Sequence, residues 1–418
     1  MKKSCIVLFG AVAMLAACEK ENENTVPVDQ LTERKDFVLT RSDLDFIQAN
    51  NGFAIDLFKR VAAKEDGKST LISPLSVTVD FGMVNNGAVG DTRDEINRVL
   101  GYQEGTVDGL NAFCQSMLVQ SGKVDPSTTL NIANAAVINK KWAQLKDSFI
   151  KTIQSTYDAE VIYKVFGQDD VMGLINNWCN EKTNGMIPSL LEEQPNEREY
   201  AHFLNAVYFK GIWSNKFNKK DTKKENFTRE DGSRINVDMM WQKDRFNFSE
   251  LGDVSEALCL PYGNQAYRMI LLLPTEGKTL DDVKEALDAD SWQTMLKSFT
   301  GIEVDVKLPV FETETPTLKL TDALKEMGIR KAFTTSADFS AMSDQTVCIG
   351  NVIHKAKIKV DETGSEAAAV TDAAIYGTAI GLDPEPKVVN FHCDRPFLYA
   401  ITEVSSGAIF FLGQYTGK

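Results

Sequence analysis

Histidine is scarce in this chain of 418 residues, since His202, His354 and His392 are the only three. None of them lies in an HExxH motif, and the sequence has no GxSxG, no phosphate-binding loop and no GxGxxG. A Ser-His-Asp triad has no fixed spacing along a sequence, because its three members come together only in the fold. The 59 acidic residues single out no glycosidase pair. We therefore expect no enzyme, no metal site and no cofactor.

Dense basic stripes are also missing. The formal net charge is −14 and the pI is near 4.9, which argues against a nucleic-acid-binding protein. With 43% hydrophobic and 25% charged residues the composition is that of an ordinary globular protein. Length alone favours two or three domains.

The cysteines form no CxxC pair. Apart from Cys5 and Cys18 they stand at positions 114, 179, 259, 348 and 393, an odd number. Cys259 and Cys348 lie in apolar runs, so we expect buried free thiols that act as small hydrophobic residues. A disulfide is the alternative.

The N-terminus has the pattern of an export signal. Lys2 and Lys3 precede an apolar run from 6 to 15, which is too short to span a bilayer, and "LAAC" ends at Cys18. This resembles a bacterial lipoprotein signal: residues 1–17 would be removed and Cys18 would carry lipid, including palmitate. A plain secretory signal is the alternative. Residues 18–41 are polar and acidic and are expected to form a disordered tether.

Hydrophobic periodicity indicates helices early in the chain. Phe53, Leu57 and Val61 recur every four residues, as on one face of an amphipathic helix. In "GDTRDEINRVLG", Thr92 with Glu95 predicts a capping box and Gly101 predicts the helix end.

Strand patterns dominate later. Apolar and charged residues alternate in "EVDVKLPV" (303–310) and "HKAKIKV" (354–360), as in half-buried strands, and "RMILLLP" (268–274) reads as a fully buried strand. The order of these elements predicts an α+β fold.

One stretch fits two structures. "DETGSEAAAVTDAAIYGTAI" (361–380) is alanine-rich like a surface helix, yet it also suits a strand that enters a sheet. In a strand, alternate side chains point to opposite faces, and Glu366 and Asp372 would share the outer face. The other parity holds only small or apolar residues: Ser365, Ala367, Ala369, Thr371, Ala373 and Ile375. This alternation favours insertion, because burying an unpaired charge is costly.

Seven strings from about Ser42 to Gly417 resemble the serpin family of serine protease inhibitors. In order, they are "LISPLSVT" with "GAVGDTRDEI", "INNWCNEKTNGMI", "LNAVYFKGIWSNKF", "LPYGNQAYRMILLLP", "LTDALKEMGIRKAFTTSADFSAM", "VIHKAKIKVDETGSEAAAVT" and "FHCDRPFLYAI". The resemblance implies a single domain over 42–418, with three β-sheets, eight or nine helices and an exposed reactive-centre loop at about 362–390.

The resemblance also implies a mechanism. An inhibitory serpin is cleaved in the loop by its target protease, forms an acyl-enzyme, and inserts the cleaved loop into the central sheet. The protease is thereby trapped irreversibly. Serine endopeptidases, and also cysteine endopeptidases, are the expected covalent partners. A non-inhibitory serpin that acts in binding or as a chaperone is the alternative.

Several positions match functional regions of the family. The "shutter", where the sheet opens, corresponds to Ser73, Ser76, Asn205 and His354, which are expected to form one buried hydrogen-bonded cluster. The "breach", where the loop enters, corresponds to Trp213. The hinge of the loop corresponds to Glu362, Gly364, Ser365, Glu366, Ala367, Ala368, Ala369 and Thr371.

Family spacing from Gly364 puts the cleaved bond at Thr378–Ala379. Counting back from Pro384 puts it later, so the window includes Tyr376, Gly377, Ile380 and Gly381. Small and aliphatic residues there suit elastase-like or subtilisin-like proteases, whereas Tyr376 would suit chymotrypsin-like or cathepsin-like enzymes. The window holds no Arg or Lys, which argues against trypsin-like targets.

One position departs from the family pattern. In some relatives the counterpart of Glu362 pairs with a lysine, but that position here is Val310, so this latch is absent or built differently. No basic cluster corresponds to the polysaccharide site of some relatives, and we expect no heparin-like activator. We expect a monomer held by lipid on Cys18 at the outer membrane and exposed at the surface. Secreted and periplasmic locations are the alternatives.

Overall fold

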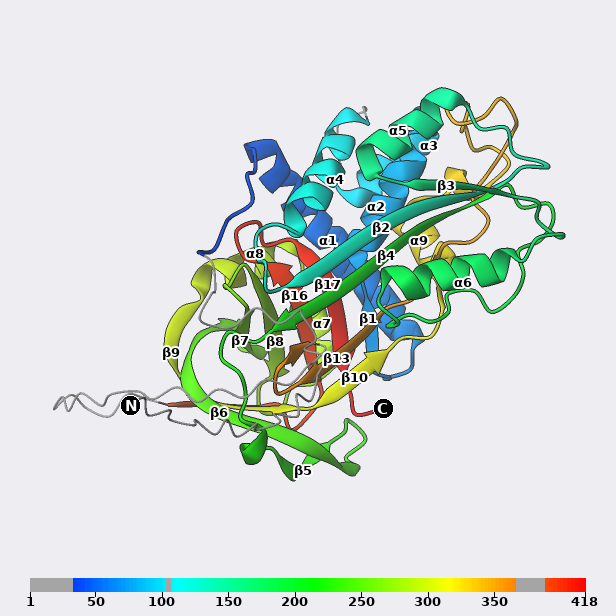
Figure 1. Cartoon of the computed structure of the whole chain (residues 1–418). Coiled ribbons are helices and arrows are strands. Elements are labelled where there is room, and N and C mark those ends of the chain that lie inside the picture. The colour runs from blue at the N-terminus through cyan, green and yellow to red at the C-terminus, as the bar shows by residue number, and fades with distance from the viewer. Residues whose placement is uncertain (1–32, 103–106, 366–387) are drawn as a thin grey trace, which may run out of the picture. The chain divides into compact units, whose positions relative to one another are not determined.

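The computed structural model describes residues 33–102, 107–365 and 388–418 (Figure 1). All of these belong to one compact unit, Thr32–Lys418. The signal segment, Cys18 and most of the tether lie outside the described residues, so the expectations for them stay predictions. No helix among the described residues is both long enough and apolar enough to cross a membrane.

The described residues contain nine α-helices. The longest, α1, begins with a capping box in which Thr40 and Asp43 bond reciprocally, and the predicted face of Phe53, Leu57 and Val61 is buried. The helices are α1 (Arg41–Lys64), α2 (Pro74–Asn85), α3 (Gly90–Leu100), α4 (Asp108–Ser121), α5 (Asp147–Tyr157), α6 (Val171–Lys182), α7 (Leu280–Ala286), α8 (Ala289–Ser298) and α9 (Thr321–Met327), with 3-10 turns η2 (Lys219–Asp221) and η3 (Lys331–Phe333).

The capping box predicted at the start of α3 is wrong. The helix begins at Gly90, two residues before Thr92, and its N-cap Val89 makes no side-chain bond. Thr92 accepts the backbone N–H of Asp338, and Glu95 accepts those of Arg330 and Lys331. Backbone N–H groups of a distant segment thus use the side chains of Thr92 and Glu95, which are then not available to cap the helix. The predicted helix end is confirmed, because Gly101 is left-handed with φ 87°.

A nine-stranded sheet forms the larger of two main layers. At one edge β15 runs parallel to its neighbour β9, whereas the other paired strands in the described part of this sheet are antiparallel. The predicted strand at 303–310 falls in β9, where Val304, Val306 and Leu308 are buried. In sheet order the strands are β1 (Thr70–Ile72), β17 (Ile409–Tyr415), β16 (Phe397–Glu403), β8 (Tyr267–Pro274), β7 (Ser255–Tyr262), β6 (Arg234–Leu251), β9 (Thr300–Pro309) and β15 (Val389–His392), with β5 (Lys223–Thr228) paired to β6.

The hinge of the loop lies in a six-stranded sheet. A third sheet has two strands. The stretch predicted as one strand at 354–360 is split between the two sheets, although Ala356, Ile358 and Val360 are buried as expected. The six strands in order are β10 (Phe311–Glu314), β13 (Lys357–Asp361), β14 (Gly364–Ser365), β4 (Ala201–Ile212), β2 (Thr129–Asn139) and β3 (Glu160–Lys164), and the two are β11 (Leu318–Lys319) and β12 (Ile353–His354).

Helices cover both faces of the six-stranded sheet. On one face α6 packs over β2 and β4, and Ile175, Val137 and Leu204 share a small core there (Figure 1). On the other face α2 packs against β4 and β17, and Val207 and Phe209 join the main core. Alternate residues of β4 therefore face different cores, as the pleat requires. Three sheets and nine helices confirm the predicted α+β architecture.

All five cysteines among the described residues are free. Four are buried, and burial raises the pKa of the Cys259 thiol to about 12. The prediction for Cys348 is wrong, because this thiol is exposed. Its apolar neighbours Val347 and Ile349 pack against the core, and the alternation of the chain turns Cys348 outward.

Candidate functional site

The hinge residues Gly364 and Ser365 already lie in the six-stranded sheet. They form β14, which pairs with β13 on one side and β4 on the other, antiparallel to both. Ser365 faces Val360 and Gly211, and Gly364 faces Asp361 and Ile212. Within the described chain no ladder joins β13 to β4 directly. The hinge therefore enters a sheet whose two central strands are held apart.

Ser365 is enclosed by aromatic residues. Its side chain has no exposed surface, and its Oγ lies 2.6 Å from the hydroxyl of Tyr262. Trp213 stacks on Tyr262 with ring centroids 4.4 Å apart, and its Nε1 donates to the carbonyl of Asp361. Trp213 thus lies beside the hinge strand, and its role in loop entry stays a prediction. Tyr262 has no assigned role in the sequence, because only the fold brings it to the hinge.

Gly364 is held where a side chain does not fit. A Cβ at this position would overlap the carbonyl oxygen of Gly211 and lie 2.8 Å from the Cα of Ile212. The hinge glycine is therefore required by close backbone approach as well as by conformation.

We expect Gly364→Ala to lower the free energy of unfolding by about 1–3 kcal/mol, the usual cost of overpacking. The matched control is Gly350→Ala, because a Cβ there meets no atom within 4 Å. Thermal unfolding of the intact variants measures the effect. Equal stability of the two variants would contradict the close contact.

Glu362 has a partner other than the family lysine. Its Oε1 accepts a bond of 2.8 Å from the hydroxyl of Thr222, and its carbonyl accepts the N–H of Phe217 at 3.0 Å. Val310, which occupies the lysine position, lies after the end of β9 and is half-buried. The latch is therefore built differently, with a neutral hydroxyl as the donor.

Ser73, Ser76 and His354 form one connected group beneath the sheet. Ser73 is the N-cap of α2, and its Oγ accepts the N–H of Ser76 and donates to the carbonyl of Phe410. The backbone N–H of Ser73 donates to Nε2 of His354 at 3.0 Å. Burial lowers the pKa of His354 to about 4, so the ring is neutral and accepts this bond at pH 7.

Asn205 is bonded outside this group. Its Nδ2 donates to Oδ1 of Asn134 on the adjacent strand β2 at 2.7 Å, and Asn134 in turn donates to the carbonyl of Tyr157. The single four-residue network expected from the sequence is therefore two separate groups. Oδ1 of Asn205 is buried and accepts no hydrogen bond in the structure of the described residues.

The other predicted site residues lie outside the described residues. These are Glu366, Ala367, Ala368, Ala369, Thr371, Tyr376, Gly377, Thr378, Ala379, Ile380 and Gly381, together with Cys18.

The histidines show no catalytic pairing with a hydroxyl among the described residues. His392 on β15 lies 2.8 Å from Asp305, and His202 lies 2.9 Å from Glu199. Trp241 also donates to Asp305, at 3.2 Å. The first pair joins the neighbouring strands β15 and β9, and the second lies at the start of β4, where the two residues are three positions apart.

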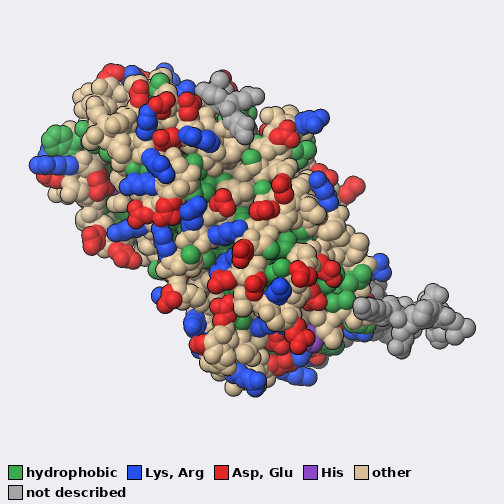
Figure 2. Space-filling model, turned by 180° about the vertical axis from the view of Figure 1, so that it is seen from behind, with side chains coloured by type: hydrophobic (Ala, Val, Ile, Leu, Met, Phe, Trp, Pro, Cys, Tyr) green, Lys and Arg blue, Asp and Glu red, His purple; other side chains and the backbone are tan. Residues whose placement is uncertain are grey.

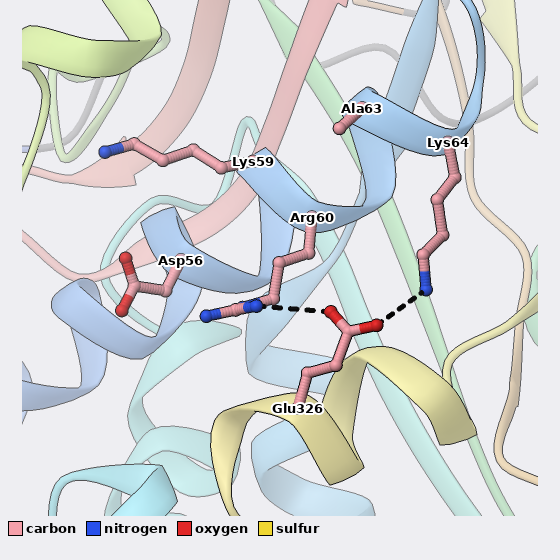
Figure 3. A pocket seen from close by; sticks show the side chains of 6 residues that line it. All are labelled: Asp56, Lys59, Arg60, Ala63, Lys64 and Glu326. Carbon is pink, nitrogen blue, oxygen red and sulfur yellow. Dashed lines mark hydrogen bonds and ion pairs between the residues drawn. The ribbon is translucent and has the colours of Figure 1, made fainter.

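A shallow hollow between α1 and α9 has a volume of about 350 Å³ (Figure 3). Glu326 bridges Arg60 and Lys64 at 3.2 and 3.5 Å, and Asp56, Lys59 and Ala63 complete the lining. The six side chains include no serine, cysteine or histidine. The hinge in the sheet therefore remains the candidate functional site.

Comparison with known proteins shows the family of the chain. The family model for serpin (serine protease inhibitor) matches residues 48–417. Leukocyte elastase inhibitor of Homo sapiens is 33% identical over 380 residues, which cover 88% of this chain and 98% of that protein. Iripin-2 of Ixodes ricinus is 33% identical over 377 residues, covering 88% and 92%.

Solved structures show the same fold. The native state of the thermophilic serpin tengpin superposes with a TM-score of 0.81 at 26% identity, over 94% of this chain and 99% of that one. Serpins are mostly protease inhibitors and not enzymes, although some do not inhibit. The matched model covers most of the chain, and the chain belongs to the serpin family.

Proposed function

We propose that this chain is an irreversible, suicide-type inhibitor of serine endopeptidases, with cysteine endopeptidases as a second target class. The observation that carries the proposal is the position of β14 between β13 and β4. A loop that continues from Ser365 between these strands would find both edges free for pairing along the described strands. Strand addition of this kind gives the chain a driving force after cleavage.

The register of β14 supports insertion with one set of alternate residues pointing inward. Continued from Ser365 and Gly211, it would place Ala367 opposite Phe209 and Ala369 opposite Val207, both of which belong to the main core. Small residues at these positions would fit over large ones. The loop residues that point inward would thus lie opposite residues of β4 that also point inward.

The same register gives two polar positions a counterpart. Glu366 would lie between Lys210 of β4 and Lys359 of β13, a favourable cross-strand arrangement. Six residues after Ser365, Thr371 would lie between Asn205 and His354. The hydroxyl of Thr371 could then donate to the unbonded Oδ1 of Asn205. Insertion would thus supply the hydrogen bond that the buried Oδ1 of Asn205 lacks.

We propose Thr378–Ala379 as the cleaved bond, within the window 376–381. The protease serine would attack the carbonyl carbon of Thr378, the bond to the nitrogen of Ala379 would break, and Ala379 would leave as a protonated amine. The resulting ester would be trapped before water reaches it. Elastase-like or subtilisin-like proteases are the proposed targets.

Cys18 supports the remaining part of the proposal. We propose a monomer anchored by lipid on Cys18 to the outer membrane and exposed at the surface, without a polysaccharide activator. Mass spectrometry of the mature chain tests this, because the lipid adds a fixed mass at residue 18.

The test of inhibition is covalent trapping. The chain is mixed with elastase-, subtilisin- and cathepsin-type proteases, and denaturing gels are scored for a complex that survives boiling. Mass spectrometry of the released C-terminal peptide should find Ala379 as its first residue. Clean cleavage across the whole panel, with no complex and no rise in thermal stability, would instead favour a non-inhibitory serpin.

A further inference from the structure

A run of lysines lies beside the hinge. Residues 216–224, here called the lysine segment, contain five lysines in nine positions: Lys216, Lys219, Lys220, Lys223 and Lys224. The segment covers η2 and the start of β5, and all of these lysines but Lys216 are exposed. In Figure 1, β5 lies at the lower edge of the molecule.

The lysine segment and the strand that follows it are bonded to both ends of the loop. Phe217 and Thr222 bond to Glu362, just before β14. On the far side, the N–H of Thr228 at the end of β5 donates to the carbonyl of Asp394 at 2.8 Å, just after β15. The lysine segment and β5 therefore link the point where the loop leaves the described structure to the point where it rejoins it.

Most of this positive charge is uncompensated. Lys224 pairs with Asp238 at 2.9 Å, and the neighbouring Glu225 pairs with Lys307 at 2.7 Å. Lys216, Lys219, Lys220 and Lys223 have no ion-pair partner among the described residues. Elsewhere charges of both signs are interspersed, as the face in Figure 2 shows, and the whole chain is strongly acidic. The segment is thus a local positive field on a negative protein.

We propose that the lysine segment is a docking surface for the acidic rim of the target protease. This rests on the proposed function, since a protease that holds the loop must sit over the chain joining its two ends. Four lysines on flexible stems attract carboxylates without fixed geometry, which suits a contact formed before the loop is cut. Such a field raises the rate of encounter and is weakened by salt.

Other anions fit the position less well. A polysaccharide or an anionic membrane on the lysine segment would occupy the place that the protease must enter. Asp221 and Glu225 also interrupt the run, which disfavours a long polyanion. The docking surface therefore selects among proteases by their charge, in addition to the selection by residues 376–381.

The experiment compares Lys220→Glu/Lys223→Glu with the matched variant Lys140→Glu/Lys151→Glu. All four lysines are exposed, and α5, which carries Lys151, lies at the opposite end of Figure 1 from β5. The probe is a subtilisin-type protease with an acidic rim, and the same protease with those rim residues changed to amides. Association rates are measured at low and high ionic strength. Binding to both proteases with the catalytic serine changed to alanine is measured in parallel.

We expect the Lys220/Lys223 variant to associate about tenfold more slowly with the acidic protease at low salt. The loss should vanish at high salt and with the neutralised protease, and the matched variant should behave like the parent. Equal rates for both variants, or equal losses with both proteases, overturn the proposal. So does a rate difference that appears only after adding heparin or anionic vesicles. If the active protease is cleanly released while binding to the inactive one still depends on the lysines, docking stands and trapping fails.

Discussion

Replacing Ser365 with arginine is expected to turn the chain from an inhibitor into a substrate. Ser365 has no exposed surface, and its Oγ lies 2.6 Å from the hydroxyl of Tyr262, whose ring stacks on Trp213. A guanidinium there would be buried without a carboxylate, which costs several kcal/mol. If this cost falls on the barrier to insertion, trapping slows by about a hundredfold or more. Deacylation would then release the protease.

The measurement is the ratio of covalent complex to cleaved chain on denaturing gels. Asn390→Arg is the control, because Asn390 is exposed on β15 at the other end of the loop and does not enter the six-stranded sheet. Ser365→Ala should keep trapping, since it adds no charge or volume. A normal yield of complex from the arginine variant would refute insertion at this residue.

The sequence predicts the architecture well because the architecture depends on local pattern. The period of four in α1 and the alternation in β9 reflect burial of one face, and the fold realises both. The hinge is marked by its own residues, since only Gly fits beside Gly211 and only a small side chain fits beside Tyr262.

The partners of the site depend on contacts between distant segments, which no local pattern records. Thr222 bonds Glu362 across 140 positions, and Tyr262 meets Ser365 across 103. Asn134 takes Asn205 away from the expected group because β2 and β4 place them opposite each other. The error at Thr92 has the same origin: a side chain with the right spacing for a local cap is used by a remote backbone instead.

Asp80 is an acidic residue whose burial the sequence does not predict. It lies on α2 one turn after Ser76, on the face that Ser73 shares. Its Oδ1 is buried and has no hydrogen-bond partner in the described structure. The residue as a whole retains a little exposed surface, but burial raises the pKa of the carboxyl well above its usual value. The native fold therefore holds an unsatisfied acid beneath the sheet.

The pH dependence follows from this raised pKa. The folded chain binds the Asp80 proton more tightly than the unfolded chain does. Above the unfolded pKa of about 4, the native state therefore loses stability as pH rises, until the folded pKa is passed. His354 acts in the opposite direction, because its folded pKa of about 4 favours unfolding as pH falls below its ordinary value. Cys179, whose pKa is raised by burial and by Asp80, remains a neutral thiol throughout.

We expect Asp80→Asn to raise the free energy of unfolding by roughly 1–3 kcal/mol at pH 7, the cost of a buried unsatisfied polar group. The gain should shrink toward zero as pH falls below about 4, where the carboxyl becomes protonated in the unfolded state as well as in the folded one. Thermal unfolding across this range measures it, and the difference between parent and variant cancels His354, which both retain. Asp45→Asn removes the same charge from an exposed position of α1 and should change little at any pH. A gain that is independent of pH, or one shared with Asp45→Asn, would show that Asp80 is solvated in the native state. A gain confined to neutral pH would mean that this buried acid lowers the stability of the uncleaved fold, which is the state that loop insertion must leave.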